Sequence, residues 1–180
     1  MPGTVEFGQE RRKMSGRHRR YFLKEKESKE ILERASQRFK VSLKEVLGEK
    51  ASIEIVETDF GEVYLINGKP TLIVTEAAVY PTLTSKELFA MFPRIVVDMG
   101  AVPFVCKGAN IMAPGIRRFE GSFSRGDIVF VVDEKHGKPL ALGEAMYNVE
   151  EARKVKQGSI IKNTHYVGDN IWKLVKDIAT

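Results

Sequence analysis

The segment that most constrains the fold spans residues 97–116, VDMGAVPFVCKGANIMAPGI, because glycine and proline determine where it turns. Gly108 can take the left-handed backbone conformation that ends a helix, so a short helix should reverse there into a strand over residues 110–112. Pro114 and Gly115 should then close that strand with a turn. The segment therefore predicts a helix and a strand lying side by side, with a crevice between them.

The small residues at this corner also suggest a binding role. Gly108 and Ala109 would leave backbone amides close to any ligand in the crevice, and such amides suit phosphate or ribose oxygens. The basic pair Arg117 and Arg118 follows shortly after them. The alternative is a structural corner whose glycines serve only the turn, and the residues alone leave both interpretations open.

The residues before Pro93 predict a small α/β domain. Apolar residues recur at helical spacing over residues 24–39, and Thr84 with Glu87 forms a capping-box pattern at the start of a second helix. Strands are expected over residues 52–56, 62–66 and 71–75, the last two joined by an Asn67-Gly68 hairpin turn. A proline disfavours helical geometry in the residue before it, so we place the domain boundary at residues 92 and 93.

The residues after Pro93 predict many short strands and only brief helices, which is typical of a small, partly closed β-barrel. The expected strands cover residues 94–97, 110–112, 127–133, 139–147, 158–166 and 170–175, and the expected helices cover 98–107 and 149–156. The fold class is therefore α+β, with an amino-terminal domain over residues 1–92 and a second domain over residues 93–180.

The charge is concentrated at the amino terminus. The chain has a net charge of +5, and residues 1–24 hold seven basic and two acidic residues, a difference of seven minus two that equals the whole net charge. A basic arm over residues 1–23 suits a polyanionic partner. A frayed, solubilising tail is the alternative.

Several function classes lose support from the composition. No stretch approaches the length of an apolar membrane span, and the first thirty residues lack the apolar core of a secretion signal, so we expect a cytoplasmic protein. The single cysteine, Cys106, excludes an intramolecular disulfide and a zinc site built on several thiolates, and it is interpreted as a small buried residue. No motif implies a cofactor, a metal or a catalytic centre, although a triad assembled by folding stays open.

Residues 97–116 closely resemble the core motif of the PUA domain, the RNA-binding module named after pseudouridine synthases and archaeosine transglycosylases. The stretches Arg125-Gly126-Asp127 and Gly143-Glu144-Ala145 resemble later parts of the same module. Three further stretches resemble the malignant T-cell amplified sequence family of translation proteins and its archaeal relatives. They are Ile66-Asn67-Gly68, Tyr80-Pro81-Thr82-Leu83 and the ending NTHYVGDNIW over residues 163–172.

The resemblance implies a small α/β amino-terminal domain followed by a PUA pseudobarrel that binds structured RNA between its first helix and second strand. The residues carried over to that groove are Lys107, Gly108, Ala109, Asn110, Ile111, Met112, Pro114 and Gly115, with Lys162, Asn163, His165 and Tyr166 on the last strand. Lys107, Lys162, Arg117 and Arg118 would neutralise phosphates. His165 and Tyr166 alternate on a strand, so one of them should be a packing residue. Pro103 should make the first helix start late or bend.

Three functions compete at this point. The first, implied by the resemblance, is a non-enzymatic RNA-binding protein that docks on the small ribosomal subunit or initiator tRNA during initiation, reinitiation or recycling, with a second translation factor as a candidate partner. The second is an accessory RNA-binding subunit for tRNA or rRNA modification of the pseudouridine or archaeosine type. The third is a protein-interaction scaffold whose basic arm only solubilises it.

Overall fold

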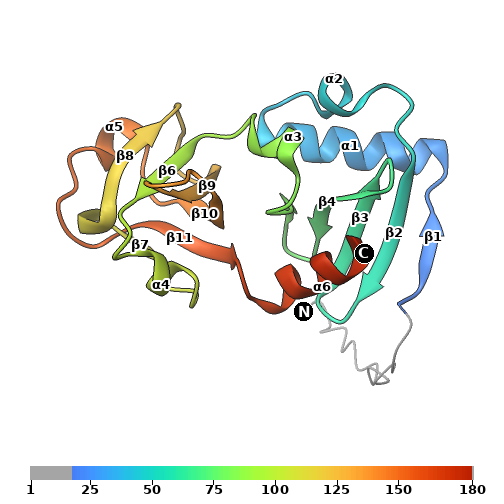
Figure 1. The fold of residues 1–180 in the computed structure, drawn as a ribbon. Coiled ribbons are helices and arrows are strands. Elements are labelled where there is room, and N and C mark those ends of the chain that lie inside the picture. Colours follow the sequence, from blue (N-terminus) through green and yellow to red (C-terminus); the bar gives the residue numbers. More distant parts are fainter. Residues whose placement is uncertain (1–17, 180) are drawn as a thin grey trace, which may run out of the picture.

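The computed structural model describes residues 18–179 and contains two β-sheets joined side by side (Figure 1). Residues 1–17, which hold most of the predicted basic arm, lie outside the described residues. The fold confirms the predicted class: a small α/β part is followed by a curled, mostly antiparallel sheet. No helix within residues 18–179 is long and apolar enough to cross a membrane.

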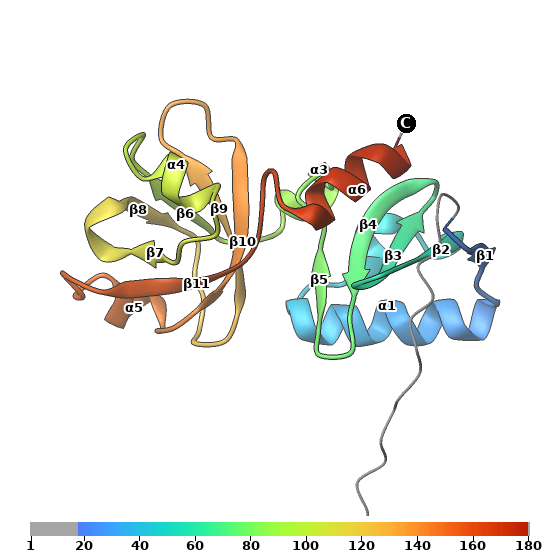
Figure 2. The same ribbon diagram turned by 90° about the horizontal axis from the view of Figure 1, so that it is seen from below.

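The amino-terminal sheet has five antiparallel strands in the order β1-β2-β3-β4-β5. They are β1 (Arg20–Phe22), β2 (Ile53–Thr58), β3 (Gly61–Ile66), β4 (Lys69–Val74) and β5 (Val79–Pro81). The predicted hairpin turn is confirmed, since Asn67 and Gly68 both have positive φ angles, of 52° and 80°. Helix α1 (Glu25–Phe39) lies on one face of this sheet and α6 (Asn170–Ala179) on the other (Figures 1 and 2). A short helix, α2 (Leu43–Leu47), follows α1.

Two predictions about helices in this part were wrong. The strand expected over residues 170–175 is the helix α6, whose Ile171, Val175 and Ile178 pack together against β2 and β3. Its first turn is capped by Asp169, whose Oδ1 accepts a hydrogen bond from the Trp172 backbone N–H at 2.7 Å. Helix α3 (Lys86–Phe89) is capped by Ser85 rather than Thr84, because the Ser85 hydroxyl accepts from the Leu88 N–H.

The carboxy-terminal sheet has six strands in the order β7-β11-β10-β9-β6-β8 and curls into a half-barrel (Figure 2). The β6–β9 pair is parallel and the other pairs are antiparallel. The strands are β6 (Arg94–Val97), β7 (Ile111–Met112), β8 (Ile116–Glu120), β9 (Ile128–Asp133), β10 (Pro139–Ala145) and β11 (Ser159–Tyr166). Strands β1, β5 and β8 were not predicted, because short edge strands carry little periodic signal.

Both predicted helices of this part exist, and the first is shorter than expected. Helix α4 (Val102–Val105) replaces the helix expected over residues 98–107, and Pro103 lies in its first turn, so the predicted late start is confirmed. Helix α5 (Val149–Ala152) occupies the second predicted region. A 3₁₀ turn, η1 (Ala113–Gly115), contains the predicted Pro114-Gly115 turn between β7 and β8.

One apolar cluster belongs to both sheets. Phe130 of β9 is fully buried and makes edge-to-face contacts with Phe89 and Phe92, with ring centroids 5.1 and 5.4 Å apart. Phe92 in turn contacts Phe39 at the end of α1 at 5.2 Å. Because these rings come from both parts of the chain, the two sheets are joined through a shared core rather than through a loose linker.

Candidate functional site

The corner predicted at Gly108 is present, and its amides are already used within the protein. Gly108 has a φ of +92°, which confirms the left-handed turn after α4. Its N–H donates to the Val105 carbonyl at 3.0 Å, and the Ala109 N–H donates to the Phe104 carbonyl at 3.1 Å. The two amides that the sequence suggested for a ligand therefore stabilise the turn, as the structural alternative proposed.

Strand β11 contacts this corner through the hydrogen bonds of Asn163 and the ring of Tyr166. The Asn163 side-chain amide donates to the carbonyls of Val105 and Ala109, at 3.1 and 2.9 Å. The Asn163 backbone N–H donates to Oδ1 of Asn110 at 3.1 Å. A Cβ added at Gly108 would lie 2.9 Å from the Tyr166 ring, so the glycine also makes room for that ring. Asn163 and Tyr166 thus set the position of the corner relative to β11.

His165 is the packing member of the His165–Tyr166 pair. Its side chain is 1% exposed and its Nδ1 lies 2.7 Å from Oδ2 of Asp169. Burial of the Asp169 carboxyl opposes its ionisation, but hydrogen bonds from His165 and from the Trp172 and Tyr166 backbones outweigh that effect and lower the pKa of Asp169. The structure places His165 beneath the surface, beside Tyr80 of the amino-terminal part.

The lowered pKa of Asp169 makes a stability prediction. We expect Asp169→Asn to lower the free energy of unfolding by about 1.5–3 kcal/mol at pH 7, the usual value of hydrogen bonds to a charged group. A carboxyl with a lowered folded-state pKa contributes fully above its unfolded value of about 3.9, and the contribution is lost as the pH falls through the folded value. The difference between wild type and variant in urea denaturation should therefore shrink below about pH 4. A difference that is constant down to pH 3 would contradict this assignment.

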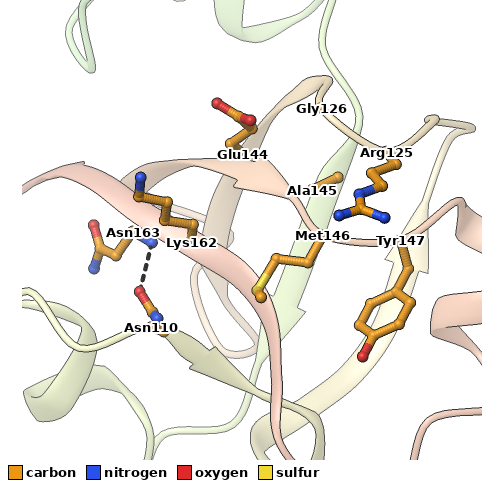
Figure 3. Close-up of a pocket in the computed structure, with 9 residues that line it drawn as sticks. All are labelled: Asn110, Arg125, Gly126, Glu144, Ala145, Met146, Tyr147, Lys162 and Asn163. Carbon is orange, nitrogen blue, oxygen red and sulfur yellow. Dashed lines mark hydrogen bonds between the residues drawn. The ribbon is translucent and has the colours of Figure 1, made fainter.

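A groove of about 770 Å³ lies over β10 and β11, next to the corner (Figure 3). Its lining residues are Asn110, Arg125, Gly126, Glu144, Ala145, Met146, Tyr147, Lys162 and Asn163. Asn110, Lys162 and Asn163 were among the predicted site residues, whereas Arg125, Glu144, Met146 and Tyr147 were not. The pairing of β10 with β11 brings these two groups together, because it sets Glu144 directly opposite Lys162.

The predicted basic site residues, together with Arg125 of the groove, fall into two groups. Arg117 Nε lies 3.2 Å from Glu134 and Arg118 Nε lies 3.0 Å from Glu120, so both guanidinium groups on β8 are paired with carboxylates. Lys107, Arg125 and Lys162 are exposed and make no ion pair with any residue in the described range 18–179. These three cations are available to an anionic ligand.

The remaining predicted residues differ in exposure. Ile111 is 2% exposed and packs in the core, whereas Met112 is 47% exposed on the surface of β7. Pro114 is exposed and Gly115 is half-buried in the η1 turn. Cys106 is half-buried, and burial raises the pKa of its thiol, so the thiol is protonated at neutral pH. Residues 18–179 contain no cluster of three histidine, cysteine or acidic side chains that could hold a metal.

Comparison with known proteins agrees with this architecture. The PUA domain model matches residues 93–167, and the model of a domain of unknown function, DUF1947, matches residues 19–85. An uncharacterized protein of Methanocaldococcus jannaschii is 40% identical over 157 residues, which cover 86% of this chain and 95% of the relative.

A named relative and a solved structure extend the comparison. Translation machinery-associated protein 20 of Saccharomyces cerevisiae is 31% identical, over 71% of this chain and 75% of the yeast protein. The crystal structure of a PUA domain from Aeropyrum pernix K1 matches with a TM-score of 0.79 and 27% identity, over 91% of this chain and 94% of the other. The chain therefore belongs to the family of PUA-domain proteins that includes translation machinery-associated protein 20 and malignant T-cell-amplified sequence 1.

Proposed function

We propose that this protein is a non-enzymatic RNA-binding protein of the cytoplasmic translation machinery, acting on the small ribosomal subunit or initiator tRNA. The observation that carries the proposal is the groove over β10 and β11, bordered by exposed cations that have no carboxylate partner within residues 18–179. Phosphates contribute most of the affinity in RNA binding, so uncommitted lysine and arginine side chains are the groups such a site needs. The translation-associated relatives support the assignment of the process.

The groove also suggests how an RNA would be held. Lys162 and Arg125 can neutralise phosphates on either side of the cavity, while Tyr147 and Asn110 contribute a ring and an amide to its lining (Figure 3). An aromatic ring can stack on an unpaired base, and an amide can bond a base edge or a 2′-hydroxyl. We therefore infer a preference for unpaired or distorted segments of structured RNA over regular duplex.

Co-sedimentation tests the proposed function. Purified protein would be mixed with isolated small subunits, large subunits or bulk tRNA over a series of salt concentrations. Retention on small subunits or tRNA at physiological salt, weakened by Lys162→Ala and unaffected by Lys29→Ala, is the expected result, because Lys29 is paired with Glu25 near the start of α1. Tight tRNA binding without subunit binding would favour an accessory role in RNA modification. Binding to none of the three would leave the scaffold function.

The two groups of basic residues should behave differently in the same assay. Arg117→Ala and Arg118→Ala each remove a cation that is paired with a carboxylate, Glu134 for Arg117 and Glu120 for Arg118. We expect each to weaken RNA binding by less than about twofold, compared with about five- to eightfold at 0.1 M salt for a lysine that contacts a phosphate. Equal losses for Arg117→Ala and Lys162→Ala would contradict the division into paired and available cations.

A further inference from the structure

Glu144 is an unusual residue to find in a groove proposed for a polyanion. Its side chain is 49% exposed, it lines the cavity, and the register of β10 with β11 sets it opposite Lys162. Opposite charges at directly opposed positions of an antiparallel pair normally attract each other. A Glu144–Lys162 ion pair would take from the groove one of its available cations. Yet no such pair forms among the described residues.

The partner of Glu144 comes from the amino-terminal part of the chain. Arg38, in the last turn of α1, has Nη2 at 3.8 Å from Oε2 of Glu144, and its Nη1 donates to the Gly126 carbonyl at 3.0 Å. The next basic residue, Lys40, lies 2.8 Å from Asp127 in the loop that carries Arg125. The end of α1 thus neutralises Glu144, which lines the groove, and Asp127, which follows the lining residue Gly126.

We propose that Arg38 is a positioning residue that holds Glu144 and thereby keeps Lys162 free for an RNA phosphate. The inference deepens the proposed function and rests on it. The amino-terminal part then sets the RNA affinity of the carboxy-terminal groove through charge, without Arg38 touching the RNA. Loss of the Arg38 charge would release Glu144 toward Lys162, so the groove would lose one available cation to the new ion pair.

The fold itself should tolerate changes to this pair. Arg38 and Glu144 are 35% and 49% exposed, and ion pairs between exposed groups contribute little to stability. Arg38→Gln should therefore unfold in urea at nearly the same midpoint as wild type. Arg38→Lys keeps the positive charge and provides the conservative control.

A double-mutant cycle, read out by the anisotropy of a fluorescein-labelled tRNA pool, tests the inference in the full chain. We expect Arg38→Gln to weaken binding by about five- to eightfold at 0.1 M salt and to lower the salt slope by about one, as the loss of one phosphate contact would. Arg38→Lys should recover most of that loss. Glu144→Gln should bind more tightly than wild type, and adding Arg38→Gln to Glu144→Gln should cost less than about twofold, because the carboxylate that needed a partner is gone.

The outcomes separate the inference from the proposed function. If wild type binds tRNA but Arg38→Gln costs the same factor with and without Glu144, then Arg38 contacts the RNA or acts structurally and the inference is overturned. If Arg38→Gln binds as wild type does, Glu144 does not compete for Lys162. If wild type binds neither tRNA nor ribosomal subunits at low salt, the proposed function itself fails, and the inference fails with it.

Discussion

Replacement of Phe130 with alanine should lower the free energy of unfolding by about 3–5 kcal/mol, the range found when a buried aromatic side chain is truncated. The ring is fully buried and contacts Phe89 and Phe92 edge to face, so its removal leaves a cavity between the two sheets. Because these contacts come from both parts of the chain, the two parts of the variant should also unfold less cooperatively with each other. Urea denaturation followed by circular dichroism and by Trp172 fluorescence measures both effects.

A matched control is available on α4. Phe104 is 67% exposed, so Phe104→Ala removes the same atoms without creating a cavity and should change stability by no more than about 0.5 kcal/mol. For Phe130→Ala, we further expect the transitions seen by the two probes to separate. Trp172 fluorescence reports on the amino-terminal part, whereas circular dichroism reports on the strands of both sheets. Coincident transitions with a loss below 1 kcal/mol would show that the two sheets do not depend on this ring.

Reversing the charge of both Lys107 and Lys162 should weaken tRNA binding by more than about 25-fold at 0.1 M salt. Each phosphate contact contributes about five- to eightfold at that salt concentration, so losing two gives at least 25-fold, and the new carboxylates add repulsion. The slope of log K against log salt should fall by about two. Both side chains are exposed and make no ion pair within the described part of the chain, so Lys107→Glu/Lys162→Glu should fold normally.

The matched control changes the net charge equally at another place. Lys26 and Lys50 are exposed lysines of the amino-terminal part, and Lys26→Glu/Lys50→Glu also makes the protein more negative by four charges. We expect that control to weaken binding far less, because a screened charge acts over about 10 Å at 0.1 M salt. Similar losses in the two double variants would mean that binding follows net charge alone and that the groove has no special role.

Local signals in the sequence were sufficient for much of the fold. The apolar spacing of α1, the Asn67-Gly68 turn and the Gly108 corner are each determined within a few residues, and all three were predicted. The segment IWKLV at residues 171–175 was ambiguous, because so short an apolar run fits a strand or a helix. Asp169 as a helix cap and the spacing of Ile171, Val175 and Ile178 were the signals that could have decided it.

The site was less predictable because it depends on strand register. Lys162, Asn110 and Asn163 follow from the motif, but nothing local shows that Glu144 faces Lys162, since a bulge between Leu142 and Gly143 shifts the pairing of β10 with β11. Alternation showed that His165 or Tyr166 must be buried without showing which. The pairing of Arg38 with Glu144 joins residues about one hundred positions apart, and only the packing of the two sheets reveals it.

Helix α6 completes the core of the first sheet, although it is translated after the whole second sheet. The first sheet is made early, but the face formed by Val56, Val63 and Leu65 is covered by a helix encoded in the last residues of the described chain. Domains generally fold as they leave the ribosome, from the amino terminus onward. Here the first sheet must wait, with an apolar face open to solvent, until the whole second sheet has been translated. A nascent chain stalled after β5 and before α6 would therefore expose this face and be a natural target for chaperones, however complete its second sheet.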